Sequence, residues 1–159
     1  MYIADCMLGR LAKWLRVLGH DVAYHRRISD ERLIAEARRE GRILLTRDTR
    51  LVRRRAVSDG GVRHILIASD RPEEQLAQMV EDHALPLEPV RFLSRCLRCN
   101  EPNAPVERAL VEDRVPPYVF RTQETFSCCP ACGRIYWKAT HVDSILERLP
   151  LNIRAGLGR

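Results

Sequence analysis

The sequence predicts an α/β fold in which a three-layer domain with a parallel sheet precedes a small cysteine-bearing domain. Two observations predict it. Strand-like and helix-like segments alternate over residues 1–91, which is typical of parallel strands joined by crossover helices. Beyond them stand two Cys-x-x-Cys pairs with 29 residues, 100–128, between them. We expect domains at 1–93 and 94–149, the second ending in a helix, and a flexible tail over 150–159.

The first elements follow from short apolar runs and one amphipathic pattern. An apolar run over residues 1–4 indicates the first strand, and Asp5 ends it. Apolar residues then recur at helical spacing over 8–18, so we expect a helix that Gly19 terminates. Residues 22–24 indicate the second strand.

The remaining elements repeat this alternation. Ser29 is expected to cap a helix that runs to Gly41. Residues 42–46, RILLT, form the clearest buried strand, and a short helix is expected over 49–55. Residues 64–68, HILIA, indicate the next strand, and Arg71-Pro72-Glu73-Glu74 opens the last helix of the domain. Residues 85–90, with two prolines, indicate a linker or an edge segment.

The paired cysteines have the spacing of a structural zinc site. We do not expect Cys128 to be a ligand, because only Cys129 has two residues between itself and Cys132. Redox dithiols and a disulfide framework also use paired cysteines. A redox motif normally follows a strand and opens a helix, whereas Pro, Gly and short β-like runs flank these pairs. The expected Zn²⁺ ligands are Cys96, Cys99, Cys129 and Cys132.

Charge and composition narrow the class of protein. The net charge is +6, and all the basic residues except Lys13 and Lys138 are arginine. This balance suits an anionic partner such as nucleic acid, although an arginine-rich solvated surface explains it equally well. The sequence shows no signal peptide and no apolar window that could cross a membrane. We therefore expect a cytoplasmic protein, where reduced cysteines favour metal over disulfides.

Aspartates follow the predicted strands at the edge where parallel sheets bind ligands. Asp5, Asp48 and Asp70 each come after a strand, and Asp30 opens the second helix at the same edge. Carboxylates that converge in this way suit Mg²⁺ or Mn²⁺, the ions that support phosphodiester hydrolysis. Each also has a structural explanation, because Asp30 and Asp48 can stabilise helix starts and Asp70 can cap the turn before Pro72.

Basic side chains surround the same edge. Such residues would hold a nucleic-acid backbone without reading its sequence, and the alternative for each is a solvated surface position. The candidates are Arg10, Lys13, Arg16, Arg47 and Arg50.

Four segments closely resemble the Mut-seven C-terminal RNase domain family. They are residues 5–21, 42–48, 95–100 and 129–141, in the family's order, and the resemblance extends from residue 1 to about 149. It implies a PIN-like nuclease fold joined to a zinc ribbon, with RNA as substrate and a divalent cation as cofactor. Ala139 departs from the family, which usually has glycine there.

The resemblance also assigns residues. The family's acidic site maps onto Asp5, Asp30 and Asp48, with Asp70 a weaker fourth, and the ribbon ligands map onto the four cysteines. Asp21 precedes a strand and is left as a structural or supporting residue. We therefore expect a metal-dependent ribonuclease in which the ribbon aids folding and RNA binding, and most ribbon aromatics form its core. The alternatives are a non-catalytic RNA-binding or adaptor protein, and a phosphatase.

Overall fold

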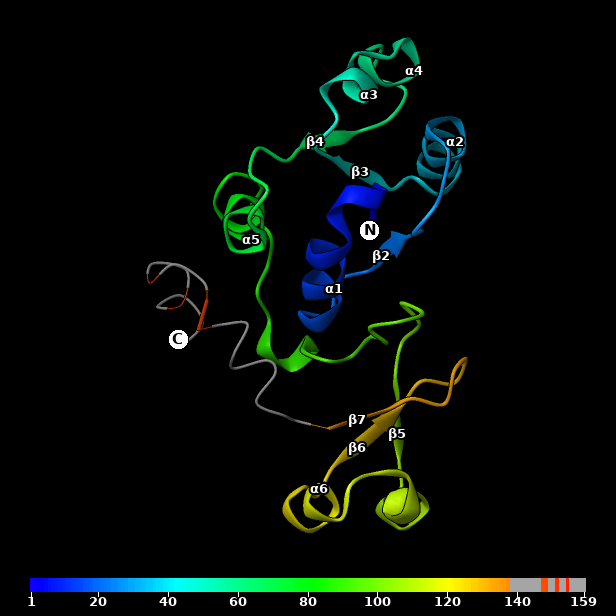
Figure 1. The fold of residues 1–159 in the computed structure, drawn as a ribbon, viewed down its shortest axis with the longest axis vertical. Helices are drawn as coiled ribbons and strands as arrows, with labels where there is room; N and C mark the ends of the chain where they lie inside the picture. The colour runs from blue at the N-terminus through cyan, green and yellow to red at the C-terminus, as the bar shows by residue number, and fades with distance from the viewer. Residues whose placement is uncertain (138–146, 149–150, 152–153, 155–159) are drawn as a thin grey trace.

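The computed structural model describes residues 1–137, 147–148, 151 and 154 (Figure 1). Its larger sheet contains β1 (Tyr2–Ala4), β2 (Val22–Tyr24), β3 (Ile43–Thr46) and β4 (His64–Leu66). The strands are all parallel, in the order β2-β1-β3-β4. The predicted α/β class with a parallel sheet is confirmed.

Helices cover both faces of this sheet. They are α1 (Gly9–Val17), α2 (Asp30–Glu40), α3 (Thr49–Arg53), α4 (Arg55–Ser58) and α5 (Pro72–Glu81). Neighbouring strand residues point to opposite faces, so Leu45 packs in the core under α1 and α5, while Leu44 packs in the core under α2, α3 and α4. The result is the expected three layers.

Local sequence signals set most element boundaries. Ser29 caps α2 by accepting a hydrogen bond from the Arg32 backbone N–H, and Gly41, with φ 63°, ends the helix in the left-handed region. A 3₁₀ turn, η1 (Cys6–Leu8), precedes α1, so the first helix begins slightly differently from the prediction. The single helix expected over 49–55 is divided into α3 and α4, because Arg54 is extended at φ −62°, ψ 135°.

Near the end of the domain one strand is shorter than expected, and the structure decides between the two alternatives for residues 85–90. The strand predicted over 64–68 ends at Leu66, and the Ala68 N–H donates to the Gln78 side chain instead of to a strand. Within 85–90 the structure shows no strand. Leu85 is buried against α5, and a 3₁₀ turn, η2 (Pro89–Arg91), follows. This segment is therefore a packed connection and not an edge strand.

The second sheet is antiparallel, in the order β5-β6-β7. Its strands are β5 (Ala104–Val106), β6 (Phe126–Cys128) and β7 (Ile135–Trp137), with η3 (Arg108–Arg114) and α6 (Pro117–Thr122) between the first two. Phe120, Phe126 and Trp137 belong to its small core, as expected. The C-terminal helix predicted for this domain and the predicted tail over 150–159 lie largely outside the described residues. Among the described residues, no helix is both long and apolar enough to span a membrane.

Candidate acidic site and zinc centre

Asp5 lies at the carboxyl end of β1, and its carboxylate is only 5% exposed. Its Oδ1 accepts a hydrogen bond of 2.7 Å from the Met7 N–H. Its Oδ2 accepts from the Thr46 hydroxyl and, at 3.3 Å, from the Arg47 N–H. These bonds fix the carboxylate between the ends of β1 and β3, and they keep a buried charge solvated by polar groups.

The Thr46 hydroxyl connects the backbone of Asp48 to the Asp5 carboxylate. The Asp48 N–H donates to the Thr46 Oγ1 at 3.0 Å, and the Asp48 Oδ1 accepts from the Arg50 N–H at 2.7 Å, which caps α3. The structure therefore brings Asp5 and Asp48 to the ends of adjacent strands, as the sequence predicts. Thr46 was not among the residues predicted for the site, although a polar residue at the end of a buried apolar strand such as RILLT could have indicated it.

Asp30, at the start of α2, is ion-paired with Arg54 at 2.8 Å. Arg54 also binds Glu31 at 2.7 Å. Its hydrogen bond with Glu31 and the nearby charges of Asp30, Glu31 and Asp48 raise the pKa of Arg54. An arginine held by the extended break between α3 and α4 thus supplies positive charge to the acidic edge, a role that the sequence did not reveal.

Asp70 is placed differently from the other three aspartates. It is exposed beyond β4, and its side chain makes no hydrogen bond or ion pair with any described residue. The structure therefore leaves Asp70 outside the bonded set around Asp5, Thr46 and Asp48.

The acidic edge has the oxygen donors that Mg²⁺ and Mn²⁺ prefer. Within the described parts of the chain, however, no three carboxylates come close enough to hold one ion as a ready-made cage. Mg²⁺ is commonly held by one or two carboxylates, with waters and substrate phosphates completing its shell. The donor set fits such an ion in chemical type, and Thr46 links the Asp5 carboxylate to the backbone N–H of Asp48.

The four predicted cysteines do converge. The Sγ atoms of Cys96, Cys99, Cys129 and Cys132 all lie within 4.8 Å of one another. The Cys96 and Cys132 sulfurs are 3.6 Å apart, close to the separation of about 3.8 Å that tetrahedral zinc with 2.3 Å bonds requires. All six cysteines are free, which contradicts the disulfide alternative, and Cys128 lies outside the group.

Hydrogen bonds favour the thiolate form at one of the four cysteines, Cys96. Burial alone would raise the pKa of Cys96, but bonds from the Tyr136 hydroxyl and from the Cys99 and Arg98 N–H groups lower it to about 6. The pKa of Cys99 is raised to about 12 by its hydrogen bond with Cys132 and by the charge of Cys96. Repulsion between thiolates limits how many of the four cysteines ionise, and a bound cation would remove that limit. Gly133, which directly follows the second cysteine pair, has φ 69°.

Arg16, predicted to contact nucleic acid, does not lie at the surface. The residue is only 5% exposed, and its guanidinium is used internally. Nε and Nη2 donate to the Val22 carbonyl at 3.0 and 2.7 Å, and Nη1 donates to the Leu97 and Arg98 carbonyls at 3.1 Å. Arg16 therefore joins α1 and β2 to the backbone between Cys96 and Cys99, the first cysteine pair. A zinc ion with four thiolates has a net charge of about −2, which a nearby arginine offsets.

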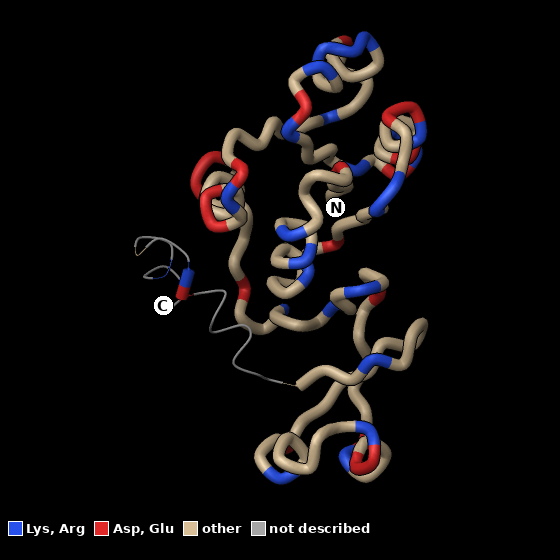
Figure 2. The backbone as a smooth tube through the Cα atoms, viewed as in Figure 1, with Lys and Arg blue, Asp and Glu red and all other residues tan. Residues whose placement is uncertain are grey.

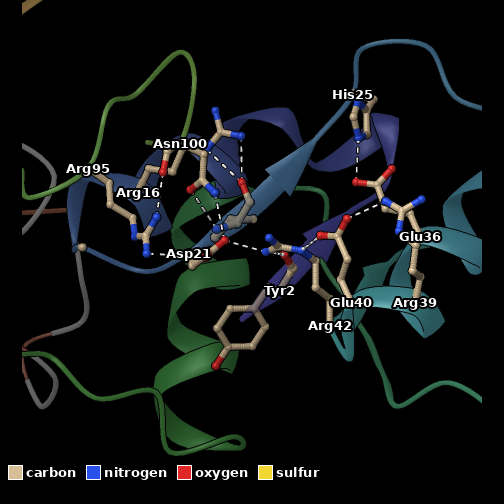
Figure 3. A network of polar contacts seen from close by, with 12 residues as sticks. Tyr2, Arg16, Asp21, His25, Glu36, Arg39, Glu40, Arg42, Arg95 and Asn100 are labelled. Atoms are coloured by element: carbon tan, nitrogen blue, oxygen red, sulfur yellow. Dashed lines mark hydrogen bonds and ion pairs between the residues drawn. The ribbon is translucent and has the colours of Figure 1, made fainter. Parts of the chain in front are cut away.

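Asp21 joins the same two parts of the molecule. It accepts hydrogen bonds of 2.5 Å from Arg42 and 2.8 Å from Asn100, and it lies 3.5 Å from Arg95 (Figure 3). Burial alone would raise its pKa, but the bonds from Arg42 and Asn100 hold the pKa below its ordinary value. The structural role expected for Asp21 matches this position.

Replacing Asp21 by asparagine should lower the free energy of unfolding by about 2 kcal/mol at neutral pH, because Arg42 and Arg95 lose their compensating charge. The folded-state pKa lies below 3.8, so this contribution is present above that pH and complete at neutrality. Urea unfolding checks it. Asp82→Asn, at an exposed position, is the matched control. Equal stability of the two variants would contradict the assignment.

The other predicted basic residues lie at or near the surface. Arg10, Lys13 and Arg50 are exposed, and Arg47 is half-buried. The Arg47 Nε is buried without a partner among the described residues, so it retains capacity for an acceptor. Basic residues are frequent along α3, α4 and the segment before α2, whereas acidic residues are more frequent than basic ones in α5 (Figure 2).

Comparisons with known proteins give one match. A family model described as Mut7-C RNAse domain matches residues 1–149, nearly the whole chain. Neither curated proteins nor solved structures give a match.

Proposed function

Because the chain belongs to the Mut7-C RNAse domain family, we propose that it is a divalent-metal-dependent ribonuclease that hydrolyses RNA phosphodiester bonds. The observation that carries this proposal is the hydrogen-bonded run from Asp5 through Thr46 to Asp48. Both aspartates follow adjacent parallel strands, at the edge where ligands bind in such sheets, and this supports a shared site.

Asp5, Asp48 and Asp30 are the proposed ligands of Mg²⁺ or Mn²⁺. Such an ion, when bound, stabilises charge on a phosphate and lowers the pKa of a water molecule. The chain's own residues arrange the surroundings. Three hydrogen bonds hold the Asp5 carboxylate in one orientation. Arg54 offsets part of the negative charge, which would otherwise repel an anionic substrate.

Four basic residues at or near the surface are proposed to hold the RNA backbone. Arg10 and Lys13 lie on the helix that follows Asp5, and Arg47 and Arg50 flank Asp48. Contacts of this kind bind phosphates irrespective of base sequence. Arg16 is left out of this set because it is buried. Asp70 stays a weaker candidate.

The zinc ribbon is proposed to support the fold and RNA binding without taking part in hydrolysis. Four protein thiolates fill the shell of a tetrahedral zinc ion, so no position remains for a substrate. The site requires reduced cysteines, which agrees with a cytoplasmic place of action.

A non-catalytic RNA-binding protein is the second candidate. The ion pair of Arg54 with Asp30 favours it, because this pair already compensates a carboxylate that a catalytic ion would need.

Incubation of labelled single-stranded and hairpin RNA with the zinc-loaded protein and Mn²⁺ tests the proposal. We expect cleavage that EDTA abolishes. Binding without cleavage would support the RNA-binding candidate instead. Phosphate release from a generic monoester with the RNA left intact would indicate a phosphatase.

A further inference from the structure

A second basic feature lies between the β2–α2 segment and the outer face of α2. It is a hollow of about 230 Å³. Ile28 and Ala35 form its apolar part. The charged or titratable side chains that line it are His25, Arg27, Arg32, Glu36 and Arg39.

Two of these arginines have unused hydrogen-bonding capacity. Glu36 is bonded to His25 at 2.9 Å, and Arg39 is paired with Glu40 at 2.5 Å (Figure 3). The guanidinium groups of Arg27 and Arg32 make no hydrogen bond or ion pair with any residue that the structure describes. Glu36, the one acid among the described residues that line the hollow, is thus already engaged, while two guanidinium groups remain available. Guanidinium groups in this state match the geometry and charge of a phosphate.

The size and position of the hollow restrict the ligand further. Pockets that enclose drug-sized molecules measure roughly 300–1,000 Å³, so this smaller space suits one phosphate group with part of its sugar. Ile28, in its lining, stands two positions before Asp30 in the sequence. An RNA strand that crosses the acidic edge would therefore have to extend only a short way to reach the hollow.

We propose that this hollow is a phosphate subsite in which Arg27 and Arg32 hold one phosphate group of the RNA strand. The inference rests on the proposed function for its choice of ligand. The phosphate is either an internal diester or a terminal monoester, because both present the same oxygen acceptors to the two arginines.

Fluorescence anisotropy of labelled single-stranded RNA, measured with the zinc-loaded full chain and without added Mg²⁺ or Mn²⁺, tests the subsite. Arg27→Gln and Arg32→Gln should each weaken binding about five- to tenfold. Each should also reduce the slope of log affinity against log salt by about 0.7, the loss of one phosphate contact. Arg71→Gln removes the same charge from an exposed position at the start of α5 and should change affinity less than about twofold.

Two forms of the RNA identify the source of the phosphate. If a 5′-phosphorylated strand binds more tightly than a 5′-hydroxyl strand, and Arg32→Gln removes the difference, the subsite holds a terminal phosphate. Equal binding of both strands, with equal losses in the variant, assigns an internal phosphate.

Three results would overturn the subsite: losses no larger than in Arg71→Gln, an unchanged salt slope, or no measurable RNA binding by the unmodified chain. Since no cleavage is required, these results are separable from a failure of the ribonuclease proposal. A chain that binds RNA through the arginines without cutting it keeps the subsite, and one that cuts RNA with no loss in either variant rejects the subsite alone.

Discussion

Replacing Cys129 by serine is expected to unfold the cysteine domain and to leave the parallel sheet folded. Among the residues that the structure describes, the core of the second sheet has three buried apolar side chains, Val111, Val115 and Phe126, with partly buried neighbours. So small a core does not stabilise a domain without a cross-link or a metal. Binding of structural zinc supplies about 10–16 kcal/mol in small zinc domains, and this energy is coupled to folding.

The effect should extend to the contacts between the two sheets. Arg16 donates to the Leu97 and Arg98 carbonyls of the first cysteine pair, and the Val22 N–H donates to Asn100. Unfolding of this segment removes these hydrogen-bond acceptors. Amides of the second sheet should therefore exchange with solvent at once, and the Val22 amide at the edge of the first sheet should lose part of its protection.

Hydrogen exchange read by NMR, together with the zinc content, measures both effects. Cys128→Ser is the matched control, because Cys128 adjoins Cys129 in the chain but lies outside the quartet. The control should retain zinc and full protection. A Cys129→Ser protein with a protected second sheet, or a control that behaves in the same way, would show that the quartet is not a structural zinc site.

Features set by local chemistry were predictable from the sequence. The alternation of apolar runs and amphipathic segments indicated the parallel sheet. Asp5 follows β1 directly and Asp48 comes two positions after the last residue of β3, so the topology alone brings them to one edge. The cysteine spacing indicated the quartet that the structure brings within 4.8 Å.

Features set by distant partners were not predictable in this way. Arg16 lies among basic residues in the sequence of α1, and nothing local shows that its acceptors include carbonyls of residues 97 and 98. The role of Arg54 depends on a break in a helix and on acids at the start of another one. Polar side chains of this kind are positioned by tertiary contacts, which have no short-range periodicity.

Replacing Asp48 by asparagine is expected to lower RNA cleavage about a hundredfold or more, a loss typical of removing one electrostatic group from a catalytic site. Asparagine caps helices as well as aspartate does, so the hydrogen bond to the Arg50 N–H and the start of α3 should survive. The substitution thus removes the charge and leaves the fold. Asp5 is less suitable, because the Arg47 N–H and the Thr46 hydroxyl both donate to its Oδ2.

The rate of RNA cleavage in Mn²⁺ by zinc-loaded Asp48→Asn, compared with the unmodified chain, tests most directly whether the acidic edge is the catalytic site. Asp82→Asn, which removes one exposed carboxylate at the end of α5, controls for net charge. We expect cleavage to be lost in Asp48→Asn and retained in Asp82→Asn, with the same unfolding midpoint in both. Cleavage by Asp48→Asn at the rate of the unmodified chain would contradict the account.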